Sequence, residues 1–282
     1  MGAACSRDVQ CLMFPRDPVA AKSRSHRHVH RTHNVEATVV EDLHASGSTV
    51  MDGEIAQRLV AVRERIGRAE QAAGRPAGSV RLLTVSKTHE AALIRTVWAA
   101  GQRDFGESYL REALEKIEAL RDLAIEWHFI GRLQGNKTRA VAEAFAWVHS
   151  LSDARHAERL SEQRPANLPP LNLCIQVNLS DEPNKGGVTV EAVPDLLEQC
   201  RVLPRLRVRG LMAIPAPTVD PLLQRRSFAQ LRHLRDRLAR ADLPLDTLSM
   251  GMSDDLEAAI AEGATLVRIG TAIFGSRIYG EH

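Results

Sequence analysis

The chain has 282 residues, of which 44% are hydrophobic and 26% are charged, and its formal net charge is +2. This composition is typical of a soluble globular protein and excludes a collagen-like or an acid-rich disordered chain. No apolar run approaches the roughly 20 residues of a membrane-spanning helix. A near-neutral charge and only 4% aromatic residues argue against a dedicated nucleic-acid binder. The length suits one large α/β barrel or two small domains.

Lysine is scarce in this chain, because only five of the 37 basic residues are Lys. Arg stays protonated in proteins, whereas a buried Lys can lose its proton and act as a nucleophile. A Lys in an Arg-rich chain is therefore a candidate for chemistry that only an amine can perform. The five are Lys22, Lys87, Lys116, Lys137 and Lys185.

The four cysteines form no C-x-x-C pair and no Cys/His spacing typical of zinc sites, so the sequence predicts no metal site. Cys174 lies in an apolar run, which predicts a buried free thiol. Nothing in the cysteine pattern indicates an oxidising compartment.

Residues 1–50 differ from the remainder because they hold five of the eleven His and lack a periodic apolar pattern. We interpret them as a disordered N-terminal extension. Three functional alternatives stay open: a targeting peptide, although its acidic residues count against it, myristoylation at Gly2, and weak metal binding by the His-rich stretch 26–30. Met51 begins the first well-formed helix pattern, so the extension need not be part of the translated protein.

A helix is predicted from residue 52 onward, because apolar residues recur there at helical spacing. Strands and helices then alternate along the chain. The predicted strands are 80–86, 103–106, 125–131, 146–150, 171–179, 206–214, 246–250 and 265–270. The predicted helices between them include 89–101, 108–122, 153–163, 189–201, 222–241 and 254–262. Eight apolar strands joined by helices predict a single (β/α)8 barrel over residues 51–282. An open doubly wound sheet is the alternative, which the lack of G-x-G-x-x-G after the first strand disfavours in its dinucleotide-binding form.

In such a barrel the site lies at the carboxyl ends of the strands. Lys87 follows the first strand, where a desolvating wall would lower its pKa and allow attack on a carbonyl. The alternative is a strand-end Lys that reaches into solvent.

The turns after the last two predicted strands indicate an anion site. Gly251 and Ser253 precede one helix, and Gly270 and Thr271 precede another. Glycines let backbone N–H groups approach an anion, and barrels of this kind often bind phosphate after strands seven and eight. The alternative is a pair of ordinary tight turns with Ser253 as a helix cap. Together with Lys87, these turns suit a ligand with a carbonyl at one end and a phosphate at the other.

Other polar residues have simpler interpretations. His128 lies within an apolar strand and is predicted to be a core His rather than a base. Lys116 is predicted to lie on a solvated, charged helix face. Asn136 and Lys137 form either the site rim or the start of a helix, and residues 181–187 form a turn or a lid.

Residues 80–279 resemble the pyridoxal phosphate homeostasis proteins, whose barrel has the fold of the alanine racemase N-terminal domain, a fold-type III pyridoxal-phosphate barrel. The matching blocks are VSKT (85–88), FGES (105–108), WHFIGRLQGNK (127–137), QVNLSDEPNKGG (176–187), GLMAIP (210–215), LSMGMSDD (248–255) and VRIGTAIFG (267–275). The resemblance implies a Schiff base between pyridoxal 5′-phosphate and Lys87. It also implies phosphate binding by Ser249, Ser253, Gly270 and Thr271, and Arg268 facing the pyridine nitrogen.

The same resemblance implies a cytoplasmic, monomeric protein that buffers or delivers the cofactor, with pyridoxal-phosphate-dependent apoenzymes as recipients, and not an established enzyme. Alanine racemases carry a second domain that supplies a catalytic Tyr, and here only Tyr109 and Tyr279 are present. An amino-acid racemase or lyase with the same cofactor is the main alternative, and an aldolase without cofactor is a third. Ser108 replaces the family's usual Asn, which puts the expected contact near the cofactor's ring oxygen in doubt.

Overall fold

The computed structural model describes residues 36–180 and 186–275, with side chains from residue 53 onward. The chain divides into two compact units, residues 1–44 and 45–282. Helix α1 (Glu36–Ala72) begins before residue 50, so the predicted boundary of the N-terminal extension falls inside this helix. The three functional alternatives for residues 1–35 concern a segment that lies outside the described residues.

The second half of α1 buries the apolar stripe that its sequence spacing predicts. Ile55, Leu59, Val62 and Ile66 are each 6% exposed or less. Gly74 follows the helix with a φ of +65°, a left-handed conformation that glycine adopts without strain and that commonly ends helices.

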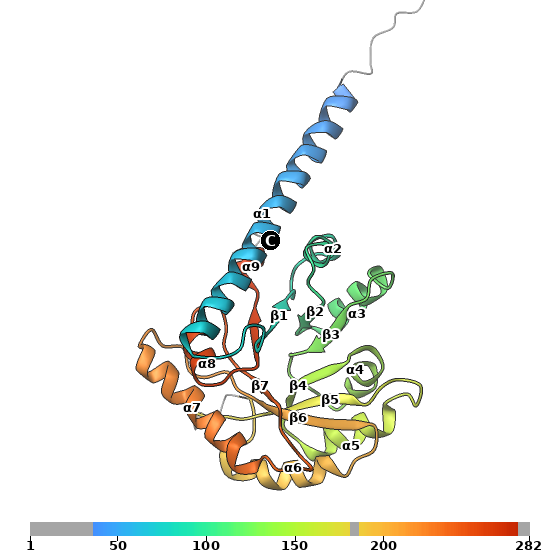
Figure 1. The fold of residues 1–282 in the computed structure, drawn as a ribbon. Helices are drawn as coiled ribbons and strands as arrows, with labels where there is room; N and C mark the ends of the chain where they lie inside the picture. Colours follow the sequence, from blue (N-terminus) through green and yellow to red (C-terminus); the bar gives the residue numbers. More distant parts are fainter. Residues whose placement is uncertain (1–35, 181–185, 276–282) are drawn as a thin grey trace, which may run out of the picture. The chain divides into compact units, whose positions relative to one another are not determined.

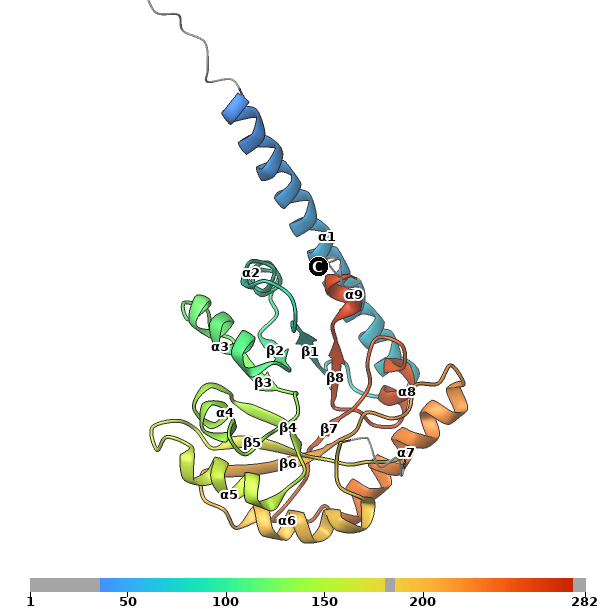
Figure 2. The same ribbon diagram turned by 180° about the vertical axis from the view of Figure 1, so that it is seen from behind.

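The core of the second unit is a closed barrel of parallel strands in the order β1 to β8. This arrangement confirms the predicted (β/α)8 fold and excludes the open sheet. The strands are β1 (Arg81–Val85), β2 (Asp104–Glu107), β3 (Glu126–Phe129), β4 (Trp147–Leu151), β5 (Leu171–Gln176), β6 (Leu206–Met212), β7 (Thr247–Ser249) and β8 (Leu266–Ile269). Closure comes from pairing of β1 with β8, for example Thr84 with Ile269. Figure 1 shows β1 to β7, and Figure 2 shows β8 beside β1.

Helices connect successive strands and lie around the barrel, as expected for parallel strands (Figure 1). The connecting helices are α2 (Ala91–Ala99), α3 (Leu110–Ala119), α4 (Thr138–Ala144), α5 (Ala154–Gln163), α6 (Val193–Arg201), α7 (Pro221–Leu238) and α8 (Leu256–Ala261), with a 3-10 turn η1 (Val190–Ala192) before α6. A short helix, α9 (Thr271–Phe274), follows β8. Lys137 is the residue before α4, so the block around it begins a helix.

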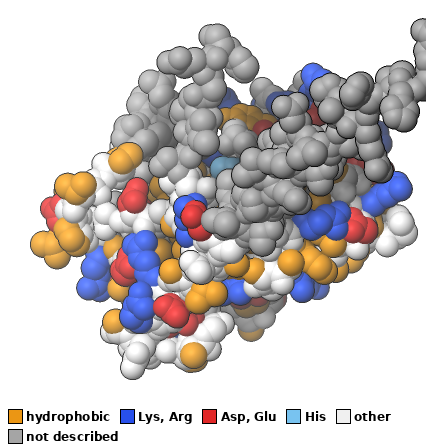
Figure 3. All heavy atoms as spheres, turned by 90° about the horizontal axis from the view of Figure 1, so that it is seen from above, with side chains coloured by type: hydrophobic (Ala, Val, Ile, Leu, Met, Phe, Trp, Pro, Cys, Tyr) orange, Lys and Arg blue, Asp and Glu red, His pale blue; other side chains and the backbone are white. Residues whose placement is uncertain are grey.

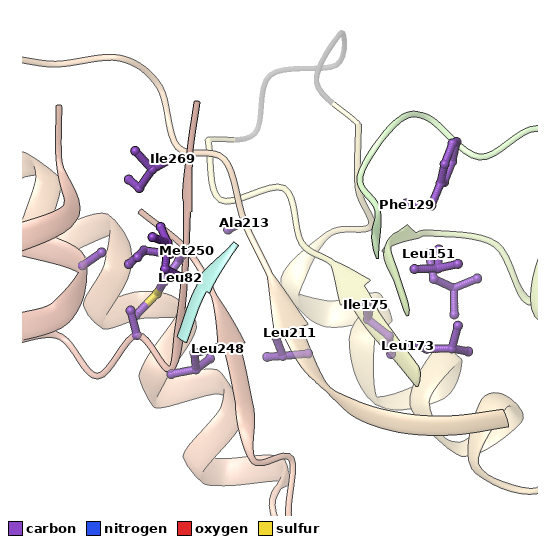
Figure 4. Packing of buried hydrophobic residues seen from close by; sticks show 14 of the residues in the cluster. Leu82, Phe129, Leu151, Leu173, Ile175, Leu211, Ala213, Leu248, Met250 and Ile269 are labelled. Atoms are coloured by element: carbon purple, nitrogen blue, oxygen red, sulfur yellow. The ribbon is translucent and has the colours of Figure 1, made fainter. Parts of the chain in front are cut away.

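Apolar side chains fill the barrel wall from several strands, among them Leu173 and Ile175 on β5 and Leu211 on β6 (Figure 4). A smaller cluster of Trp147, Cys174 and Met212 is separate from this main core. Cys174 is a free, buried cysteine, as its sequence context predicts. Burial raises the pKa of its thiol to about 12.

The described residues include no spanning helix, and their charged side chains are mixed on the face that Figure 3 shows. Among these residues, no helix has the length and apolar character that a membrane crossing requires. On the visible described part of the face in Figure 3, basic and acidic side chains are interspersed. This distribution agrees with the near-neutral charge of the whole sequence.

Candidate functional site

Lys87 lies half-buried just beyond the carboxyl end of β1. The next residue, Thr88, has a φ of +68°, an unfavourable backbone conformation for a β-branched side chain. Such strain persists only where surrounding contacts enforce it. Those contacts are visible on both sides of Lys87: the Ser86 hydroxyl donates to Glu107 Oε1 at 2.7 Å, and the Thr88 N–H donates to Glu112 Oε1 at 2.5 Å.

Lys116 supplies the cation for these two carboxylates, which corrects the prediction that it lies on a solvated helix face. It is only 6% exposed. Its Nζ donates to Glu107 Oε1 at 2.9 Å, to Glu112 Oε1 at 2.5 Å and to the Ser86 carbonyl at 2.7 Å. Burial raises the pKa of Glu107 despite this neighbouring charge. The prediction failed because the helix pattern marked Lys116 as charged but not which way it faces.

The turn after β8 packs directly against the end of β1 that carries Lys87. A Cβ atom on Gly270 would lie 3.0 Å from the Val85 carbonyl oxygen, so the backbones of the two segments are in close contact here. Phe274 on α9 stacks on His89 with ring centroids 4.4 Å apart. Thr271 is exposed at the start of α9. The structure thus brings Gly270 and Thr271 to the same edge of the barrel as Lys87.

Arg268 lies on β8 inside this end of the barrel and is only 5% exposed. Its Nη1 donates to the carbonyl and to the hydroxyl of Ser249 at 2.6 and 2.8 Å, and its Nη2 donates to the Ala213 carbonyl at 2.9 Å. These bonds use three of the five N–H groups of a guanidinium. Burial lowers the pKa of Arg268 to about 10, although the charge of Asp255 partly offsets this effect.

Ser249 connects Arg268 to two histidines inside the barrel. Its Oγ lies 2.8 Å from His149 Nδ1, and His149 Nε2 lies 2.9 Å from His128 Nδ1. Strands β4 and β7 are not neighbours, so the contact between His149 and Ser249 crosses the barrel interior. All three residues are completely buried. His128 is therefore a core His, as predicted, but it belongs to a polar chain that the sequence did not reveal.

This series of buried polar side chains ends at two carboxylates, Asp104 at the start of β2 and Glu126 at the start of β3. His128 Nε2 lies 3.5 Å from Asp104 Oδ1 and 3.4 Å from Glu126 Oε1. The Arg81 guanidinium donates to both carboxylates. His128 and Arg81 hold the pKa of Glu126 at about 2. Asp104, Glu126 and His128 are close enough to hold a metal ion, a cluster the sequence did not predict, but Arg81 already places a cation against its carboxylates.

Ser253 and Ser108 lie at the edge of this arrangement. Ser253 is half-buried, and its carbonyl accepts a hydrogen bond from Arg65 Nη1 at 2.7 Å. Helix α8 begins three residues later, at Leu256, so the interpretation of Ser253 as its cap is wrong. The Ser108 backbone packs so closely on Gly131 that a Cβ there would lie 2.0 Å from the Ser108 carbonyl oxygen.

The chain shares most of its length with proteins of known family. Residues 58–278 match the family model of the alanine racemase N-terminal domain. A pyridoxal phosphate homeostasis protein of Pseudomonas aeruginosa is 59% identical over 226 residues, which are 80% of this chain and 97% of that protein. One of Escherichia coli K12 is 48% identical over 231 residues, 81% of this chain and 99% of that protein. The chain belongs to the pyridoxal phosphate homeostasis protein family.

Solved structures support the same assignment. PipY of Synechococcus elongatus without pyridoxal phosphate is 40% identical to this chain, with a TM-score of 0.71. The match covers 79% of this chain and 100% of PipY. PipY with pyridoxal phosphate bound is 38% identical, with a TM-score of 0.69 over the same shares of both chains. Alanine racemase of Corynebacterium glutamicum, at 18% identity and a TM-score of 0.60 over 82% of this chain and 64% of that one, shows the shared fold alone.

Proposed function

We propose that this protein binds pyridoxal 5′-phosphate reversibly at Lys87 and buffers or delivers the cofactor in vitamin B6 and amino-acid homeostasis. The observation that carries the proposal is the PipY structure with pyridoxal phosphate bound, which matches 79% of this chain. The names of the curated relatives support the same role.

The residues present fit such a cofactor. Arg268 is a buried cation whose three hydrogen bonds all go to neutral oxygens of Ser249 and Ala213. A buried charge of this kind is costly unless it is paired, and two of its five N–H groups remain for a ligand. Lys87 supplies a primary amine at the same end of the barrel. A ligand with an acceptor atom for Arg268 and a carbonyl for Lys87 would contact both groups.

Each residue has a distinct part in the proposal. The Lys87 amine holds the cofactor, while Gly270, Thr271 and Ser253 hold its phosphate. Ser249, also expected from the sequence to bind the phosphate, is completely buried and its hydroxyl contacts Arg268 and His149, so its part is to support Arg268. When bound, the cofactor supplies an aldehyde carbonyl and an electron-withdrawing pyridine ring.

Arg268 faces the ring nitrogen in this proposal. A guanidinium keeps its proton, so Arg268 donates a hydrogen bond and leaves that nitrogen unprotonated. An unprotonated ring withdraws electrons less strongly, which favours holding the cofactor over using it for carbanion chemistry.

The visible absorption spectrum of the purified protein with added pyridoxal phosphate tests the proposal. We expect a band from cofactor bound at Lys87 that Lys87→Ala abolishes. Lys137→Ala is the matched control, because Lys137 also lies in a family block but at the start of α4, and it should keep the band. An unchanged band in Lys87→Ala would show that the assignment of the lysine is wrong.

Reversible binding without turnover separates this role from that of a racemase or lyase. Amino acids incubated with the loaded protein in deuterated water should show no rapid exchange of the α-proton. Fast exchange that depends on Lys87 would contradict a purely carrier role.

The proposal extends to partners and location. We infer a monomeric cytoplasmic protein that passes its cofactor to pyridoxal-phosphate-dependent apoenzymes. Activation of a purified apoenzyme by loaded protein should exceed activation by the same concentration of free cofactor when a scavenger of free aldehyde is present. Equal activation would argue against direct delivery.

A further inference from the structure

The hydrogen-bond chain through the barrel has a direction, because its two ends differ. Arg268 can only donate, so the Ser249 hydroxyl oxygen accepts from it. Burial and the positive charge of neighbouring groups lower the pKa of His149 well below its usual range, so this ring is neutral and carries one hydrogen. The direction of the chain therefore depends on which nitrogen of His149 holds that hydrogen.

The acidic end fixes the hydrogen on Nε2 of His128. If His149 carries its hydrogen on Nδ1, its Nε2 accepts from Nδ1 of His128, and His128 must carry hydrogen on both nitrogens, because a bare lone pair on Nε2 directed at Asp104 and Glu126 at 3.4–3.5 Å is repulsive. If His149 carries its hydrogen on Nε2, it donates to His128 Nδ1, and His128 again directs an N–H toward the carboxylates. Both arrangements place hydrogen on Nε2 of His128 and join Nδ1 of His149 to the Ser249 hydroxyl.

The hydrogen bond with His149 Nδ1 restricts the Ser249 hydroxyl in both arrangements. A lone pair of its oxygen remains available to Arg268. Two carbonyl oxygens complete the set of acceptors around the guanidinium. The plane of Arg268 is therefore held by acceptors whose geometry depends on a histidine on the opposite side of the barrel.

We propose that His149 and His128 are positioning residues for the cofactor, which orient the Ser249 hydroxyl and thereby hold Arg268 as a hydrogen-bond donor to the cofactor ring. This inference rests on the proposed cofactor site. Neither histidine touches the cofactor in this arrangement, because both are completely buried. They act through Ser249, and the two carboxylates at the far end hold the hydrogen on Nε2 of His128.

Nitrogen-15 nuclear magnetic resonance of histidines in the full-length, cofactor-free protein tests the acidic end of this series of hydrogen bonds. We expect hydrogen on Nε2 of His128 and a neutral His149 ring, with signals assigned by substitution. A His128 without hydrogen on Nε2 would overturn the proposal. The combined Asp104→Asn and Glu126→Gln variant removes both carboxylates, so a form of His128 without hydrogen on Nε2 should appear. An unchanged His128 in this variant would also overturn it.

Cofactor binding tests the consequence for Arg268. His149→Phe removes the hydrogen-bond partner of the Ser249 hydroxyl, and we expect about tenfold weaker binding of pyridoxal phosphate and a displaced absorption band, the effect of losing about one charge-assisted hydrogen bond. His149→Asn offers an oxygen close to the position of Nδ1, so it should restore most of both properties. The control is His233→Gln, an exposed position on α7, which should behave like the wild type.

The outcomes separate this inference from the proposed function. If the wild type shows no band from bound cofactor, the proposed function fails. The nitrogen-15 spectrum of the cofactor-free protein would still test where His128 and His149 carry hydrogen. If the wild type shows the band and folded His149→Phe matches it in affinity and position, the positioning role is wrong. If His149→Phe does not fold, the comparison of His149→Asn with the carboxylate variant decides, because only the latter should displace the band.

Discussion

Replacing Lys116 by Met should destabilise the fold strongly, because it removes the cation that holds two carboxylates behind Lys87. The side chains of Lys116 and Glu107 are 7% and 0% exposed, and their charged atoms lie 2.9 Å apart. Met fills a similar volume, so the main loss comes from leaving Glu107 buried without its partner. Breaking a buried pair in this way costs about 3–5 kcal/mol. For a domain of this size the expected fall in Tm is about 6–20 °C.

The pH dependence of this loss provides a second signature. Burial already raises the pKa of Glu107, and removal of Lys116 raises it further. A carboxyl group with a higher pKa in the folded than in the unfolded chain binds more protons when folded, so stability falls as pH rises through that interval. The stability difference between Lys116→Met and wild type should therefore widen as pH rises from about 5 toward the raised pKa of Glu107.

Urea unfolding followed by circular dichroism measures both effects. Arg121→Met is a matched control, because the side chains of its pair with Glu118 are 77% and 73% exposed, and such a pair contributes less than about 1 kcal/mol. Adding Glu107→Gln to Lys116→Met should recover part of the loss. A loss below about 1 kcal/mol in Lys116→Met, with an unchanged m value, would refute the reasoning.

Three further predictions concern the barrel itself. Gly210→Ala should prevent stable folding, because its Cβ would lie 1.7 Å from a backbone oxygen of β7. Gly67 on α1 has open space around it, so Gly67→Ala should stabilise the helix by up to about 1 kcal/mol. Thermal unfolding distinguishes the two variants. Native protein at pH 8 should resist alkylation at Cys174 and Cys200, whose thiol pKa values burial raises to about 12; peptide mapping that finds either alkylated before unfolding would contradict their burial. The pKa of Glu126 is lowered to about 2, so its ionised carboxylate stabilises the fold above about pH 4.5 and this contribution is lost on acidification toward pH 2. In Glu126→Gln the free energy of unfolding should therefore fall less steeply between these pH values, which urea unfolding measures.

The fold was largely predictable from the sequence, because parallel strands buried on both faces read as continuous apolar runs. All eight predicted strands are present, and β5 and β6 end only a few residues before their predicted limits. The predicted site residues on the last two strands share one end of the barrel with Lys87, since parallel strands all end on the same side. These successes depend on local pattern and on the rules of barrel topology.

The polar chain behind the site was not predictable, because its contacts join strands that are distant in sequence. His149 lies two residues after Trp147 on β4, so the two side chains lie on the same side of the strand. That spacing does not reveal that Ser249 lies opposite. Lys116 was misjudged for a related reason, because only the packing of α3 on the barrel turns this side chain toward Glu107 and not toward solvent.

Closure of the barrel between β1 and β8 also bears on when the protein becomes able to bind its ligand. Lys87 follows the first strand, Arg268 lies on the last strand and Gly270 follows it, and the two strands meet only when the ring is complete. During synthesis the amine is therefore made long before the residues that complete its surroundings. A ligand that contacts residues next to both strands would stabilise the pairing of β1 with β8. A chain truncated before β8 would retain the Lys87 amine but would lack Arg268 and Gly270. Uptake of the cofactor should thus serve as a check that synthesis of the barrel is complete.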